Sequence, residues 1–250
     1  MLLTRQIYGI KLYRKSVCPL IYTSSAYILL QNIKYDVAFR PLHSHTTHLI
    51  HRSPRCTFAT IKVHKNHIWV AAGSVNAKGA DFLPNMPTEE VFTAGDRDRV
   101  DGYVSNKKPL SYQGNIIDNF KLTFKDGKVV DFEAEEGYDI LKQLLDTDEG
   151  SKRIGEVALV PNDSPISNSG LLYYQTLFDE NASNHLALGA AYPTTIKDGT
   201  KMTEEELKEA HINQSISHVD FMIGDAEMDI DGILEDGTRI PVFRKGNWAF

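Results

Sequence analysis

Apolar and polar residues alternate, on both sides of one Asp-Gly pair, through Phe120-Lys-Leu-Thr-Phe-Lys-Asp-Gly-Lys-Val-Val-Asp-Phe-Glu-Ala134. Alternation with a period of two is typical of a half-buried β-strand. Asp126-Gly127 favours a type I′ turn, because both central residues of that turn need positive φ. The stretch therefore predicts two antiparallel strands joined by a tight hairpin.

Outward from this hairpin, short strands and helices follow one another without a regular strand–helix alternation. That order predicts an α+β fold, a mixed and largely antiparallel sheet domain with a few short helices. The expected elements are a helix over Gly137–Leu145, a buried strand over Glu156–Val160, a buried helix over Leu171–Phe178, a helix after the capping box Thr203-Glu-Glu-Glu206, a strand over Val219–Ile223 and a hairpin turn at Asp236-Gly237.

The composition excludes several classes of protein. The chain has 250 residues, 42% of them hydrophobic, and a net charge of −6, which argues against a nucleic-acid partner because phosphates need clustered Lys and Arg. Two distant cysteines, Cys18 and Cys56, make no disulfide framework. No apolar run is long enough to predict a membrane span. We expect a cytoplasmic protein without a membrane partner.

The charge changes sign near residue 57. Residues 1–57 hold eight basic residues and one acidic residue, a net charge of +7, whereas the rest hold 19 and 32, a net charge of −13. A transit peptide and a signal or membrane-associating segment are two interpretations. We favour a third, that residues 1–57 are not a native domain and pack poorly against residues 58–250.

His218-Val-Asp220 is the first candidate for chemistry. On a strand the side chains two apart share a face, so one imidazole and one carboxylate would point the same way. Such a pair suits zinc, cobalt or manganese. An isolated pair of this kind is more often an ordinary surface His beside an Asp.

Glu180 and His185 belong to a polar cluster that directly follows an apolar, aromatic run. Five residues correspond to about 140° around a helix, so the two could not bind one metal from a continuous helix. Either the helix breaks at residues 181–184 or the two serve different metals. The alternative is a polar helix end and loop.

Two further carboxylates need partners or a ligand. Glu156 opens a buried strand, where a structural salt bridge is the alternative to a metal. For the adjacent Glu89 and Glu90, the pattern does not say which points inward. The histidines His43, His45, His48 and His51 match no regular zinc spacing, and we do not predict a metal site there.

Four blocks, in order, resemble the signature blocks of M29 metallo-aminopeptidases, the thermophilic aminopeptidase family. They are Met86-Pro-Thr-Glu-Glu-Val-Phe-Thr-Ala94, Gly155-Glu-Val-Ala-Leu-Val-Pro161, Leu177-Phe-Asp-Glu-Asn-Ala-Ser-Asn-His185 and His218-Val-Asp-Phe-Met-Ile-Gly224, and Arg244-Lys-Gly-Asn-Trp-Ala-Phe250 is similar to the C-terminus of the family. The resemblance runs from about residue 60 to residue 250. Residues 1–57 do not resemble the N-terminal domain of the family, and we expect a truncated or frame-disrupted product.

The resemblance implies the ligands of two divalent ions, zinc, cobalt or manganese. It also implies a catalytic role for Glu156 and Tyr192, and a homodimer for the full-length family. By the same resemblance, one ion is held by Glu90, Glu156 and His185, and the other by Glu156, Glu180, His218 and Asp220, with Glu156 as the bridge.

The expected function is removal of N-terminal residues from peptides, with the peptide as partner. Two alternatives stay open. One is an inactive remnant that retains the site, and the other is a different two-metal hydrolase such as a phosphatase or nuclease.

Overall fold

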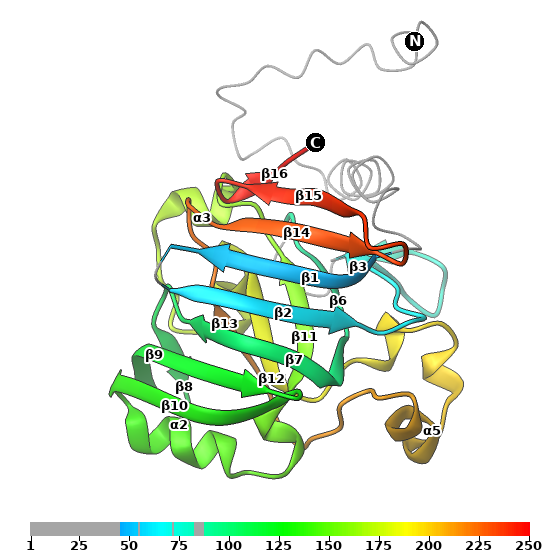
Figure 1. Ribbon diagram of the computed structural model, residues 1–250, viewed down its shortest axis with the longest axis horizontal. Helices are drawn as coiled ribbons and strands as arrows, with labels where there is room; N and C mark the ends of the chain where they lie inside the picture. Colours follow the sequence, from blue (N-terminus) through cyan, green and yellow to red (C-terminus); the bar gives the residue numbers. More distant parts are fainter. Residues whose placement is uncertain (1–45, 55, 72, 83–87) are drawn as a thin grey trace, which may run out of the picture.

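The computed structural model describes residues 46–54, 56–71, 73–82 and 88–250 (Figure 1). Most of this part of the chain forms antiparallel sheet, with a few short helices, so the predicted α+β class is confirmed. None of the helices described is long and apolar enough to span a bilayer.

The larger sheet contains nine strands among the described residues and lies in front in Figure 1. Each pair along it is antiparallel, although several of the paired strands are distant in sequence. In spatial order its strands are β10 (Lys128–Glu136), β9 (Asn115–Lys125), β7 (Gly95–Ser105), β2 (Thr57–Val63), β1 (Thr46–Ser53), β14 (Asp229–Leu234), β15 (Arg239–Arg244) and β16 (Asn247–Trp248), and β8 (Leu110–Tyr112) pairs with β9.

The smaller sheet lies behind the larger one. Its five strands, counted over the same described residues, come from widely separated parts of the sequence. In spatial order they are β13 (His218–Met222), β12 (His185–Gly189), β11 (Ile154–Leu159), β6 (Val91–Thr93) and β3 (Val70–Ala71), and a separate small hairpin joins β4 (Ser74–Val75) to β5 (Asp81–Phe82).

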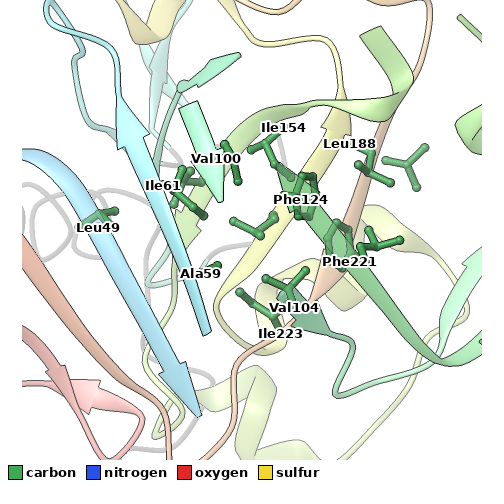
Figure 2. Packing of buried hydrophobic residues seen from close by; sticks show 14 of the residues in the cluster. Leu49, Ala59, Ile61, Val100, Val104, Phe124, Ile154, Leu188, Phe221 and Ile223 are labelled. Carbon is green, nitrogen blue, oxygen red and sulfur yellow. The ribbon is translucent and has the colours of Figure 1, made fainter. Parts of the chain in front are cut away.

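The core lies between the two sheets, where one face of each is apolar (Figure 2). Leu49, Ile61 and Phe124 come from the larger sheet, and Leu188 and Phe221 come from the smaller one. All of them are buried. Since this face of the smaller sheet is used for packing, its other face is free to carry polar side chains.

The hairpin predicted around Asp126-Gly127 is confirmed. β9 and β10 pair through Phe124 and Val129, and the φ angles of Asp126 and Gly127 are 50° and 77°, both positive as a type I′ turn requires. A side chain at Gly127 would also collide with the carbonyl of Arg97, 2.0 Å from an added Cβ.

The described helices are short and lie at the edges of the sheets. Leu141, Leu144 and Leu145 of α2 enter the main core, and the predicted capping box of α5 forms, with Thr203 and Glu206 bonding to each other's backbone N–H. The helices are α2 (Tyr138–Leu145), α3 (Pro165–Ser169), α4 (Thr176–Asp179) and α5 (Glu204–Glu209).

The buried helix predicted over Leu171–Phe178 is wrong, because only Thr176–Asp179 is helical. The Asp179 carboxylate accepts the N–H groups of Tyr173 and Gln175 at 2.6 and 3.0 Å, which holds the preceding chain in a loop. Tyr174 has a φ of 57°, outside the helical region. Leu171 and Tyr174 are also mostly exposed, so the apolar run forms surface and not core.

The poor packing predicted for residues 1–57 is wrong for residues 46–57. Strand β1 pairs with β2 on one side and with β14 on the other, and its Leu49 and His51 are fully buried. The predicted boundary at residue 57 therefore falls inside the larger sheet. The charge count missed this strand because its outward positions carry polar residues such as His48 and Arg52. Residues 1–45 lie outside the described residues.

Candidate metal centre

Most of the predicted site residues lie on the face of the smaller sheet that points away from the core, which we call its outer face. Ala158 is opposite His185, and Ala187 is opposite both Glu156 and Asp220. Residues directly opposite each other in antiparallel strands share a face. Glu156, His185, His218 and Asp220 therefore all project from the face that does not pack on the core, from three adjacent strands.

Small residues leave room between these side chains. Ala158 and Ala187 stand on the same face, and Gly189 is opposite His218. Gly189 has a φ of 103°, and a Cβ there would lie 2.1 Å from the Ser217 carbonyl oxygen. The space above the strands is consequently available to a ligand and not filled by neighbouring side chains.

One half of the cluster is built by Glu90, Glu156 and His185. His185 Nε2 lies 3.2 Å from Glu90 Oε1 and 3.6 Å from Glu156 Oε1. Glu90 immediately precedes β6 and is buried. Glu90 therefore provides the inward carboxylate of the Glu89-Glu90 pair.

The other half is built by Glu156, His218 and Asp220. His218 Nε2 lies 3.3 Å from Asp220 Oδ2 and 3.9 Å from Glu156 Oε2. The predicted shared face of His218 and Asp220 is confirmed. The two halves meet at Glu156, whose Oε1 faces His185 and whose Oε2 faces His218.

Both histidines are oriented by the backbone. His185 Nδ1 donates to the Ser183 carbonyl at 3.0 Å, and His218 Nδ1 donates to the Ala190 carbonyl at 2.7 Å. A bond of this type fixes the ring and directs Nε2 toward the cluster. Two independently held imidazoles of this kind are typical of metal ligands.

Glu180 reaches the cluster from a different element. The chain leaves α4 in a 3-10 turn at Glu180–Ala182 and enters β12 at His185, so the helix breaks between Glu180 and His185, one of the two predicted outcomes. Glu180 is buried and lines the same cavity as Glu156 and Asp220. Its carboxyl group contacts Asp220.

The protonation of the cluster reflects burial and crowded negative charge. Burial raises the pKa of Glu156 to about 7, with further contributions from Asp220 and Glu90. Burial, together with the Asp220 charge, raises the pKa of Glu180 to about 9. Four carboxylates at such close range repel one another unless cations or protons are present.

The two imidazoles titrate in the opposite sense from buried, isolated histidines. Burial alone would lower their pKa values. The adjacent carboxylates of Glu156 and Glu90 instead raise the pKa of His185 well above its usual range, and the contact with Asp220 raises that of His218 to about 9. Asp220 is shifted the other way: burial would raise its pKa, but the hydrogen bond from His218 lowers it.

The residues of this cluster are suitable ligands for divalent metal ions. His185 Nε2 is buried and makes no hydrogen bond that satisfies normal geometry among the described residues, although carboxylate oxygens surround it. An oxygen and nitrogen donor set without thiolate accepts zinc, cobalt or manganese. A cation would satisfy the unbonded nitrogen and the carboxylate charge together.

A cavity of about 640 Å³ opens onto the cluster. Tyr192 lies on its wall, half exposed, with its ring 4.7 Å from that of His218. Burial and then the nearby Glu156 and Asp220 carboxylates raise the pKa of Tyr192 to about 12. The phenol therefore carries its proton at neutral pH and can donate it in a hydrogen bond.

Two other groups of titratable residues differ from this centre. Asp96, Asp98 and His211 approach one another at the surface, a cluster that the sequence did not suggest. Arg99 and Arg153 pair with the two carboxylates, so no cation is needed there. The histidines His43 and His45 lie outside the described residues, and His48 and His51 lie on opposite faces of β1.

Buried carboxylates and imidazoles that converge on an open cavity define a metal-dependent hydrolase type of site. The chain belongs to the thermophilic metalloprotease (M29) family, whose model matches residues 38–248. The family match begins about twenty residues before residue 60, where the sequence resemblance begins. It includes the whole of β1.

The chain is similar to several aminopeptidases. The chain is 58% identical over 216 residues to aminopeptidase AmpS of Bacillus subtilis, covering 84% of this chain and 53% of that protein. It is 54% identical to aminopeptidase PepS of Streptococcus thermophilus, covering 86% and 52%. The solved structure of AmpT from Thermus thermophilus matches with a TM-score of 0.81 and 39% identity, covering 90% of this chain and 55% of that one. The chain thus spans about half the length of these relatives.

Proposed function

We propose that this chain carries the active site of an aminopeptidase that uses two divalent ions to remove N-terminal residues from peptides. The observation that carries the proposal is the position of Glu156, whose two oxygens face two separate groups of ligands. The names of the relatives support the reaction class.

In this proposal Glu156 would contribute to the ligand sets of both ions. Glu90 and His185 complete the first set, and Glu180, His218 and Asp220 complete the second. We assign these roles from the separation of the cluster into two halves at Glu156. Glu180 joins the second half because its carboxyl group contacts Asp220.

Bound divalent ions would supply Lewis acidity toward the scissile carbonyl and make water a better nucleophile. The side chains of this protein do the rest. The Tyr192 phenol, on the cavity wall beside His218, donates a hydrogen bond to the carbonyl oxygen as negative charge develops. The catalytic pair that we propose is Glu156 and Tyr192. The free amine of the peptide would bind beside the carboxylates, which selects chain ends.

A phosphoester substrate is disfavoured by the cavity wall. No Lys or Arg is present among the described residues that line it. Two-metal phosphatases and nucleases must balance the charge of their substrate, which metal alone does incompletely.

Family membership also leads us to propose a cytoplasmic enzyme that is homodimeric at full length. All the proposed ligands fall within residues 58–250, which we regard as the main part of a catalytic domain that also includes β1.

The test is an assay of the metal-free chain with added cobalt or zinc. We expect hydrolysis of leucine p-nitroanilide, no hydrolysis of bis(p-nitrophenyl) phosphate, and loss of activity on chelation. A chain that binds two metal ions per molecule yet cleaves neither substrate would support an inactive remnant that retains the site. Phosphodiester cleavage alone would overturn the peptidase assignment.

A further inference from the structure

We infer that a second cavity, beside α5 (Figure 1), binds a small organic cation that carries a primary ammonium group on a short apolar chain. This cavity has a volume of about 550 Å³. None of the described residues that line it also lines the cavity of the metal centre. The two are separate sites, and the second needs no bound metal ion.

The floor of the second cavity is apolar. Ala191, Ile212 and Leu207 of α5 line it, and all three belong to a small hydrophobic cluster that is distinct from the core between the sheets. Ile216 also lines the cavity and has 86% of its surface exposed. A ligand chain that covers this surface removes it from water, which is favourable in proportion to the apolar area buried.

The ionisable side chains on the described wall are all acidic. They are Asp148, Glu149 and Glu204. Glu149 is paired with Lys128 and Arg153. Glu204, the first residue of α5, is exposed and makes no ion pair within the described part of the chain. The charge of the wall therefore attracts a cation and repels an anion.

Asp148 is held in place without being neutralised. Its carboxylate accepts the N–H groups of Ser151 and Ile216, both at 2.8 Å, and the Ser215 hydroxyl at 2.9 Å. Burial would raise the pKa of Asp148, but its hydrogen bonds lower it, so the group is ionised at neutral pH. All three donors are neutral, and the negative charge remains available to a ligand.

Asn213 adds a buried acceptor to the wall. Only 1% of its surface is exposed, and its Nδ2 donates to the carbonyls of Gly150 and Gly189 at 2.8 and 2.6 Å. Its Oδ1 has no hydrogen-bond partner among the described residues. A buried amide oxygen normally has one, so a donor brought by a ligand would satisfy it.

These acceptors fit an ammonium group better than a guanidinium group. A carboxylate has about four acceptor sites, and three donors already use most of those on Asp148. A guanidinium binds strongly through two parallel bonds to one carboxylate, whereas an ammonium needs a single acceptor there. Its other N–H groups can point to an acceptor such as Asn213 Oδ1. The volume lies in the range of small-molecule sites.

The first experiment maps binding on the full chain. The ¹⁵N-labelled protein is titrated with n-pentylamine and followed by amide NMR. We expect the signals of Leu207, Gln214 and Ile216 to shift together with one Kd. Methylamine, n-pentanol and n-butylguanidine should bind at least about tenfold more weakly, and n-pentanoate should not bind. Equal affinity for the amine and the alcohol, or shifts confined to the strands of the metal centre, would overturn the assignment.

Three variants test whether the acidic wall is responsible. Asp148→Asn should weaken n-pentylamine binding by about tenfold or more, and Glu204→Gln by about threefold. Glu205→Gln makes the same change at an exposed position of α5 that does not line the cavity, and should leave the Kd unchanged. If Asp148→Asn fails to fold, the comparison of Glu204→Gln with Glu205→Gln decides. Equal effects of these two, or wild-type affinity in a folded Asp148→Asn chain, would show that the cavity is not the site.

A further probe separates two sources of the same ligand chemistry. Nα-acetyl-lysine methylamide presents the ammonium and its apolar chain as they occur in a polypeptide. Affinity equal to that of n-pentylamine would assign the cavity to a lysine side chain of a peptide. Binding at least about tenfold weaker would assign it to a free small amine. Either result supports an ammonium site, whereas failure of both compounds to bind would remove it.

Discussion

At the scale of single residues, Glu156 is the position at which one change affects both halves of the cluster. We expect Glu156→Ala to reduce the bound metal from two ions per chain to less than one, because the proposed bridge contributes an oxygen to each set. Metal analysis of the purified, dialysed variant checks this. Glu133→Ala, at a mostly exposed carboxylate that pairs with Lys121, is the control and should keep wild-type metal content. Two ions per chain in the Glu156 variant would show the bridge to be wrong.

His51 makes stability depend on pH. It is fully buried, its ring nitrogens have no hydrogen-bond partner within the described part of the chain, and burial lowers its pKa to about 4. Below the unfolded pKa of 6.5, the unfolded chain binds a proton that the native chain does not. The stabilisation is therefore present above pH 6.5 and is lost as the pH falls toward 4.

We expect this group to remove about 2 kcal/mol of unfolding free energy between about pH 7.5 and about pH 5. Urea denaturation of the wild type and of His51→Leu at both pH values measures it. The leucine variant should lose less stability on acidification by that amount. An identical pH dependence in both proteins would show that His51 is not held neutral.

Spacing alone predicted part of the site. The two-residue period of a strand placed His218 and Asp220 on one face, and the five-residue separation of Glu180 and His185 required a break or two metals. The choice of Glu90 over Glu89 came only from the family resemblance. The neighbours of the ligands on this face, such as Phe92 opposite Ala158, could not be predicted, because strand register, which no local pattern encodes, brings them together.

At the scale of elements, the small residues on the outer face of β11 and β12 are as necessary as the ligands. Ala187 is opposite both Glu156 and Asp220, so a larger side chain there would occupy the space between them. We expect Ala187→Leu to lower metal affinity by about tenfold or more while the core stays intact, because Ala187 projects away from it. Cobalt titration with circular dichroism tests this. Unchanged affinity in a folded variant would show that the ions do not occupy that space.

The loop before α4 shows why an apolar run misled the prediction. Leu171–Phe178 has helix-compatible composition, but the Asp179 carboxylate binds the N–H groups of Tyr173 and Gln175 and stabilises a loop. We expect Asp179→Ala to free this loop, weaken metal binding through the adjacent Glu180 and destabilise the chain by about 1–3 kcal/mol, since two N–H groups lose their acceptor. Metal titration and urea denaturation measure the two effects. A variant unchanged in both would refute this role.

At the scale of the whole molecule, metal should stabilise the fold, because the ligands come from segments as distant as Glu90 and Asp220. An ion that binds only the native chain raises its stability by about 2.7 kcal/mol at a hundredfold excess over Kd. We expect EDTA to lower the Tm and to abolish peptidase activity, and cobalt or zinc to restore both. Differential scanning calorimetry checks the first effect. A Tm that is unchanged by EDTA and by added metal would contradict this expectation.

The sequence predicted the antiparallel sheet well because hairpins are local. It failed for β1, because this strand joins the larger sheet through partners that its neighbours in sequence do not reveal. Its buried positions include His51, a polar residue whose side chain lies in the core. Charge counts describe the surface of a segment and say little about which of its side chains face inward.

The position of β1 also fixes the order in which the protein can be completed during synthesis. β1 pairs on one side with β2, which follows it directly in sequence. The other edge of β1 pairs with β14, with His48 opposite Ile233. All the residues between β2 and β14 must leave the ribosome before that edge is covered, and such distant pairing is slow. Until then, the nascent chain presents an open strand edge to its neighbours. Premature termination before Asp229 would make that edge permanent, and the product would be a substrate for chaperones and proteases.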